Sequence, residues 1–98
     1  MTRVNVEKQK IMEFCRTRHI RKLSFFGSVL RDDFGPNSDV DVLVEFEPEF
    51  VPGLEFFQME ADLSDILGHK VDLNTTGFIS KYFRDKVIAE AEVQYAES

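Results

Sequence analysis

The stretch from residue 39 to residue 46 constrains the fold more than any other part of this sequence. It reads Asp-Val-Asp-Val-Leu-Val-Glu-Phe, so that three valines and a phenylalanine alternate with a second set of residues. This alternation predicts a β-strand with its valines on one face. Asp39 and Asp41 then leave the opposite face together, with Cα atoms roughly 7 Å apart. A strand that could simply be buried therefore carries two carboxylates on one side.

Periodicity and breaker residues predict the remaining elements. Helices are expected over residues 5–18, 54–67 and 79–95, the last with Ile79, Phe83 and Val87 on its apolar side. The other expected strands cover residues 22–26 and 70–73, and residues 28–32 could form one helical turn. This order predicts an α/β (α+β) fold, with a small mixed sheet of about three strands covered by helices.

Composition narrows the class of protein. The 98 residues, 43% of them hydrophobic, are enough for one domain with a core, which we expect to span residues 1–98. Cys15 is the only cysteine and is expected on the apolar face of a helix. No apolar run approaches the roughly 20 residues of a membrane span, so we expect a soluble, cytoplasmic protein with no membrane contact. The net charge of −6 argues against direct nucleic-acid binding and fits a basic protein partner or a metal–nucleotide ligand.

A Gly27-Ser28 turn precedes Asp39, with ten residues between Ser28 and Asp39. A strand that ends in Gly-Ser and opens a helical turn offers backbone N–H groups and a hydroxyl to phosphate. Each feature alone has an ordinary explanation, a simple turn in one case and solvent-facing carboxylates in the other. Together they place a phosphate cradle and a metal-binding face on adjacent strands, as metal–triphosphate chemistry requires.

Asp72 is a third candidate, because its neighbours Val71 and Leu73 should face the core. If this short strand pairs beside residues 39–46, three carboxylates converge on one face. Such a triad could hold two Mg²⁺ ions, one polarising a triphosphate and the other activating an attacking hydroxyl near Asp72. The alternative is a solvated aspartate on a strand.

The combination of Gly27-Ser28, ten intervening residues and Asp39-Val40-Asp41 resembles the signature of the DNA polymerase β-like nucleotidyltransferase superfamily. The segment over residues 25–48 is similar to the minimal nucleotidyltransferases, the MNT-type antitoxins of prokaryotes. It reads FFGSVLRDDFGPNSDVDVLVEFEP. The resemblance extends over nearly the whole chain.

The resemblance implies a polymerase β-like core and a role for each matching residue. Gly27 and Ser28 would hold the phosphates of ATP, and Arg31 would also touch phosphate. Asp39 and Asp41 would bind both Mg²⁺ ions. By the same resemblance, Asp72 would complete the metal site and assist deprotonation of the acceptor. One departure is Asp32, where many members carry glycine.

The resemblance also implies an activity and a partner. The chain would be a Mg²⁺-dependent nucleotidyltransferase, an antitoxin that transfers AMP from ATP to a tyrosine hydroxyl of a HEPN-domain ribonuclease toxin. The alternative is a non-catalytic antitoxin that neutralises its toxin by complex formation through exposed aromatic side chains. The candidates for that interface are Phe56, Phe57, Tyr82 and Phe83, most of which we expect in the core. Transfer to a small molecule or a nucleic acid is a third, less favoured hypothesis, and the oligomeric state is left open.

Overall fold

The computed structural model describes residues 7–31, 35, 37–77 and 79–97. The elements follow one another as α1 (Lys8–Thr17), β1 (Ile20–Phe26), the 3₁₀-helix η1 (Gly27–Leu30), β2 (Val40–Phe46), α2 (Glu55–Leu67), β3 (Val71–Thr75), α3 (Lys81–Glu90) and β4 (Glu92–Ala96). The predicted α+β class is confirmed.

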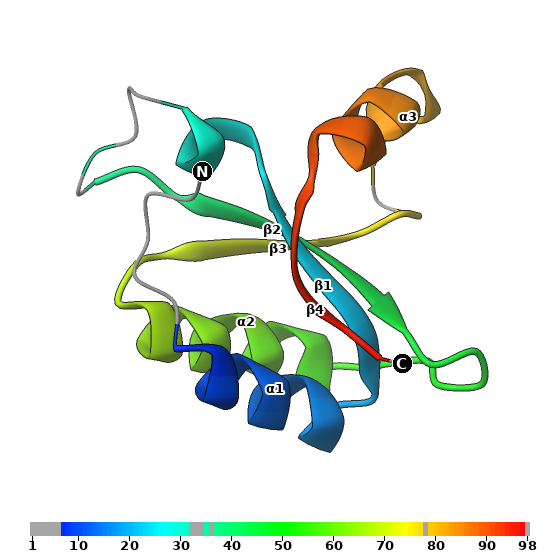
Figure 1. Cartoon of the computed structure of the whole chain (residues 1–98). Helices are drawn as coiled ribbons and strands as arrows, with labels where there is room; N and C mark the ends of the chain where they lie inside the picture. The colour runs from blue at the N-terminus through cyan, green and yellow to red at the C-terminus, as the bar shows by residue number, and fades with distance from the viewer. Residues whose placement is uncertain (1–6, 32–34, 36, 78, 98) are drawn as a thin grey trace.

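The sheet has four strands in the order β3-β2-β1-β4. β1 is antiparallel to both of its neighbours. β2 and β3 are parallel, because α2 carries the chain back to the end of the sheet where β2 begins before β3 starts. Figure 1 shows α1 and α2 together on one side of the sheet and α3 on the other side.

The core lies between the sheet and the helices α1 and α2. The alternation predicted for residues 39–46 is confirmed, since Val40, Val42 and Val44 are fully buried. From α1, Cys15 is buried as expected, and burial raises the pKa of its thiol to about 12. From α2, Leu63 is fully buried against the same cluster. Each such side chain stabilises the fold by about 1.5–3 kcal/mol relative to exposure.

The last helix differs from the sequence-based prediction. α3 ends at Glu90, and the segment expected to continue it forms β4, so the sheet has four strands rather than about three. Ala91 adopts an extended backbone (φ −63°, ψ 137°), and the β-forming residues after it pair with the free edge of β1.

α3 also fails to bury its expected apolar side. It contributes no buried residue, and Phe83 is 63% exposed. The predicted packing of this helix into the core was therefore wrong.

The outer edge of β3 is closed by α2. The backbone N–H of Leu73 donates to Glu60 Oε2 over 2.8 Å, and that of Val71 donates to Ser64 Oγ over 2.9 Å. Glu60 and Ser64 lie one helical turn apart and so face the same strand. These hydrogen bonds satisfy backbone N–H groups on the edge of β3 that faces away from β2, and they fix the position of β3 along α2.

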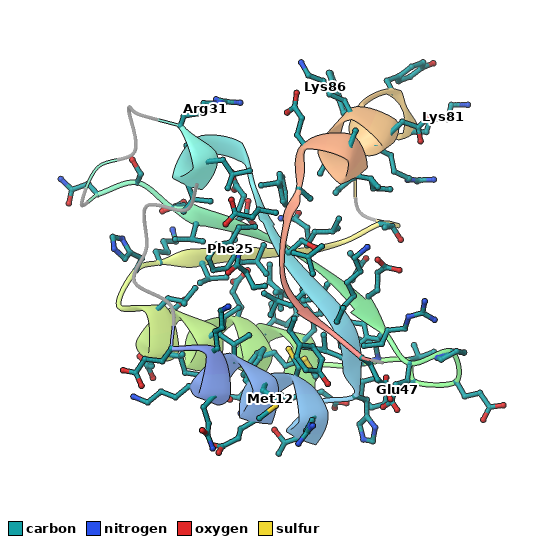
Figure 2. All side chains as sticks on the ribbon, viewed as in Figure 1. Met12, Phe25, Arg31, Glu47, Lys81 and Lys86 are labelled. Carbon is teal, nitrogen blue, oxygen red and sulfur yellow. The ribbon has the colours of Figure 1, made fainter. Side chains whose placement is uncertain are left out.

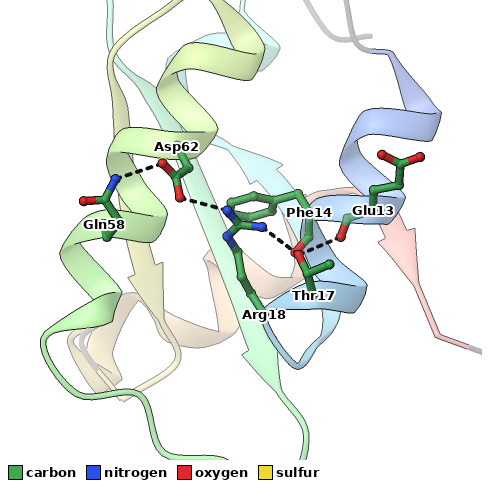
Figure 3. A network of polar contacts seen from close by, with 6 residues as sticks. All are labelled: Glu13, Phe14, Thr17, Arg18, Gln58 and Asp62. Atoms are coloured by element: carbon green, nitrogen blue, oxygen red, sulfur yellow. Dashed lines mark hydrogen bonds and ion pairs between the residues drawn. The ribbon is translucent and has the colours of Figure 1, made fainter.

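A polar network joins α1 to α2 (Figure 3). The Arg18 guanidinium donates to Asp62 Oδ2 over 2.8 Å and lies 4.5 Å from the centre of the Phe14 ring. Gln58 donates to the other oxygen of Asp62 over 2.9 Å. α2 ends at Leu67, as predicted, and is capped by Gly68 with a left-handed backbone (φ 69°). Among the described helices, none has the length and hydropathy needed to cross a membrane.

Candidate functional site

β2 and β3 bring two of the predicted carboxylates side by side. Asp41 and Asp72 are directly opposite each other in the parallel pairing. Their side chains leave the face of the sheet opposite to the buried valines, because side chains alternate along each strand. Asp39 lies one residue before β2 and two residues before Asp41, so the same alternation places it toward that face.

The charges of Asp39 and Asp72 act on Asp41. Burial raises the pKa of Asp41 above its ordinary value of 3.8, and the negative charges of Asp72 and Asp39 raise it further. The positive charge of Arg31 acts in the opposite direction. The positive charge of Arg31 therefore does not balance the negative charges around Asp41. A hard divalent cation binds favourably in such surroundings.

The described residues do not form a closed metal cage. Among them, no three Asp, Glu, His or Cys side chains are arranged so that they could hold a metal ion together. What the geometry provides is a face with neighbouring carboxylates, which are the oxygen ligands that Mg²⁺ prefers.

Gly27 fits directly against this face. Phe26, the last residue of β1, pairs with Asp41, and Gly27 follows with a left-handed backbone (φ 74°). A Cβ at Gly27 would overlap Asp41 Oδ2 and lie 3.3 Å from Asp41 Cγ. Both the backbone conformation and the position of the carboxylate therefore require glycine. The sequence predicted the turn, but not this contact.

Ser28 is the second residue of η1, and Arg31 directly follows the end of η1. The Ser28 hydroxyl lies 3.5 Å from the carbonyl oxygen of Asp39, which puts the turn next to the start of β2. The Arg31 N–H donates to the Ser28 carbonyl over 2.9 Å, and the Arg31 side chain is exposed. Figure 2 shows Arg31 on the η1 side of the sheet, away from α1 and α2. Asp32 lies outside the described residues.

Three of the four aromatic side chains weighed as an interface are exposed. Phe57, Tyr82 and Phe83 are 69%, 84% and 63% exposed, and only Phe56 is half-buried. The expectation that most of them belong to the core was wrong. Tyr82 and Phe83 lie on α3, whose residues pack only loosely against the rest of the fold, and Phe57 lies on the outer surface of α2.

Sequence reasoning also missed a cavity. A hollow of about 560 Å³ opens where β2 ends and α2 begins, with phenylalanines among its lining residues. Asp39, Asp41 and Asp72 do not line it. The available signal was that phenylalanines lie on both sides of the loop between β2 and α2. The path of that loop cannot be predicted from its composition.

Comparison with known proteins agrees with this geometry. The family model described as "Nucleotidyltransferase domain" matches residues 8–95. A Methanocaldococcus jannaschii protein, provisionally named protein adenylyltransferase MJ0435, is 32% identical over 88 residues, which cover 90% of this chain and 94% of that protein.

Two solved structures share the fold. A crystal structure described as a toxin–antitoxin with AMP-PNP has a TM-score of 0.75 at 19% identity and covers 95% of this chain and 76% of that chain. A structure described as a tri-AMPylated Shewanella oneidensis HEPN toxin in complex with MNT antitoxin has a TM-score of 0.65 at 19% identity, covering 91% of this chain and 69% of that chain. At this identity they establish the fold alone. The family match over nearly the whole chain confirms the predicted enzyme class, and the chain belongs to the nucleotidyltransferase domain family.

Proposed function

We propose that this chain is a Mg²⁺-dependent protein adenylyltransferase that uses ATP, and that its acceptor is a tyrosine hydroxyl of a HEPN-domain ribonuclease toxin. The observation that carries the proposal is the pairing of Asp41 with Asp72, with Gly27 fitted against Asp41. This arrangement sets the Gly27-Ser28 turn, which would bind phosphate, beside the paired carboxylates. The relative named as a protein adenylyltransferase and the AMPylated HEPN toxin found with an MNT antitoxin support the choice of acceptor.

Each site residue has a proposed role. Asp39, Asp41 and Asp72 would hold Mg²⁺, which when bound neutralises triphosphate charge and polarises the α-phosphate. The Gly27-Ser28 turn would bind phosphate oxygens through its N–H groups and the Ser28 hydroxyl.

The transfer itself is a displacement at the α-phosphorus of ATP. The tyrosine oxygen forms a bond to this phosphorus while the bond to the pyrophosphate oxygen breaks. Asp72, the most outward of the paired carboxylates, would accept the hydroxyl proton, since it is exposed while Asp41 is half-buried. Arg31 would stabilise the negative charge of the phosphates from the η1 side.

The decisive experiment compares the wild-type chain with an Asp39→Asn/Asp41→Asn double variant. Each protein is incubated with labelled ATP, Mg²⁺ and a HEPN-domain toxin from the same genome. The double variant should leave the toxin unlabelled, because it loses the groups that position the metal and the nucleotide. Asp65→Asn, an exposed change on α2, is the matched control and should label like wild type. Equal labelling by the double variant contradicts the proposal.

A second candidate function is neutralisation by binding alone. The exposed Phe57, Tyr82 and Phe83 favour it, since large exposed apolar side chains mark interaction surfaces. Protection of cells by the double variant separates the two. Full protection favours binding, whereas lost protection with an intact complex favours catalysis.

A further inference from the structure

The hollow at the end of β2 is an apolar pocket with an exposed rim. Phe46, Phe50, Phe56 and Phe57 are among its lining residues, and we call it the phenylalanine pocket. Two of its lining residues are strongly exposed, since Phe57 is 69% exposed and Val51 is 86% exposed. Leu54, one turn before the pocket residue Phe57, is also 86% exposed. Apolar side chains exposed together in this way mark a surface that another molecule covers.

The pocket is held in shape by its own ring contacts. The ring of Phe46 lies 5.5 Å from that of Phe50 and 6.4 Å from that of Phe56, between centroids. Phe56 and Phe57 meet edge to face at 6.2 Å. Val44, a fully buried core residue, also lines the pocket. The walls are therefore continuous with the core, and a ligand would enter a largely preformed site.

The pocket lies away from the carboxylate face. Val44 and Asp41 are on opposite faces of β2, and Phe46 is five residues beyond Asp41, about 17 Å along a strand. Figure 2 shows Glu47, at the pocket end of β2, at the other end of the molecule from Arg31. A partner held here would leave the carboxylates open.

The chain segment that carries most of the pocket lining is acidic, and Glu45 lines the pocket itself. Residues 45–55 contain four glutamates and no lysine or arginine, in a chain of net charge −6. Glu47 is paired with His19 at 2.9 Å, and Glu45 lies 3.9 Å from Lys22. In the part of the chain that the structure describes, Glu49 and Glu55 form no ion pair, and both are exposed. Their charges are available to a partner.

We propose that the phenylalanine pocket, together with Glu49 and Glu55, which adjoin its lining residues Phe50 and Phe56 in the sequence, forms a docking surface for a basic amphipathic helix of the acceptor protein. Apolar side chains at helical spacing would enter the pocket, and lysines or arginines beside them would pair with Glu49 and Glu55. That the helix belongs to the acceptor rests on the proposed function. Docking here raises the effective concentration of the acceptor hydroxyl at the carboxylate face without occupying that face.

The test measures the affinity of the full chain for a HEPN-domain toxin from the same genome, by calorimetry without ATP. Phe57→Ser should weaken binding at least tenfold, as expected for an aromatic anchor. Glu49→Lys/Glu55→Lys should also weaken it, by a factor that shrinks as salt rises. Ile88→Ser, which removes an exposed apolar side chain from α3, is the matched control and should bind within about twofold of wild type. Unchanged melting temperatures show that the variants fold.

Three results overturn the inference. The first is that both pocket variants bind the toxin with wild-type affinity, and the second is that the toxin does not bind the wild-type chain. The third is that Phe57→Ser converts a wild-type dimer to a monomer without changing the affinity for the toxin. A Phe57→Ser variant with weakened ATP binding would assign the pocket to the nucleotide instead and overturn it as well. If the toxin binds through the pocket but receives no AMP, the proposed function fails and the docking surface stands. If AMP is transferred and Phe57→Ser binds the toxin normally, the proposed function stands and the docking surface fails.

Discussion

Replacing Gly27 with alanine tests whether the turn and the carboxylate face form one site. Gly27 has φ 74°, a conformation that costs an L-residue roughly 1–2 kcal/mol. The new Cβ would also overlap Asp41 Oδ2 and lie 3.3 Å from Asp41 Cγ, so the carboxylate must move. A misplacement of about 1 Å in such a group lowers the rate about 100-fold, equivalent to about 2.7 kcal/mol.

Gly68→Ala is the matched control. Gly68 has nearly the same backbone conformation, with φ 69°, but a Cβ there meets nothing within 4 Å. Both variants should therefore lose roughly 1–2 kcal/mol of unfolding free energy in urea, from backbone strain alone. Only Gly27→Ala should also lose about 100-fold in kcat/KM for AMP transfer.

The comparison separates strain from chemistry. If Gly27→Ala transfers AMP as fast as Gly68→Ala at a temperature where both are folded, the contact with Asp41 has no role in the reaction. If Gly68→Ala loses activity to the same extent, the loss at Gly27 reflects general destabilisation. Either result refutes the reasoning.

Three further predictions concern the fold. Glu60→Ala should destabilise the chain by about 1 kcal/mol and speed amide exchange at Leu73, whereas Glu60→Gln, which keeps a carbonyl acceptor, should not; urea unfolding and hydrogen exchange measure both. Hydrogen bonds from Arg18, then Gln58, lower the pKa of Asp62, so its stabilisation is complete above pH 3.8 and is lost as the pH falls through the lowered pKa. Asp62→Asn should therefore melt below wild type at neutral pH, and the gap should close in acid; a gap independent of pH contradicts this. The Cys15 thiol, with a pKa of about 12, should resist alkylation at pH 8 until the chain unfolds.

The sequence predicts what local pattern determines. Alternation in β2 sets which face each side chain takes, so the position of Asp41 and Asp72 on the same face follows once β3 is placed beside β2. The Gly27-Ser28 turn is likewise readable from residue types. These local signals were enough to predict that Asp41 and Asp72 lie on one face, whereas the metal-binding role of Asp39, Asp41 and Asp72 stays a prediction.

Non-local pairing is what the sequence did not predict. The helical spacing of Ile79, Phe83 and Val87 suggested one long helix, but its last part pairs with β1, some 70 residues earlier in the chain. The fit of Gly27 against Asp41 depends on the register between β1 and β2, which no local pattern specifies. The phenylalanine pocket depends on the path of the loop that leaves β2.

The central claim is that the carboxylate face transfers AMP, and the position of the transferred label tests it most directly. The wild-type chain is incubated with Mg²⁺, its toxin and ATP labelled in either the α-phosphate or the γ-phosphate. The account predicts that the toxin becomes labelled from the α-phosphate alone, with pyrophosphate released. Label transferred from the γ-phosphate, or no transfer from either while the toxin is bound, would contradict it.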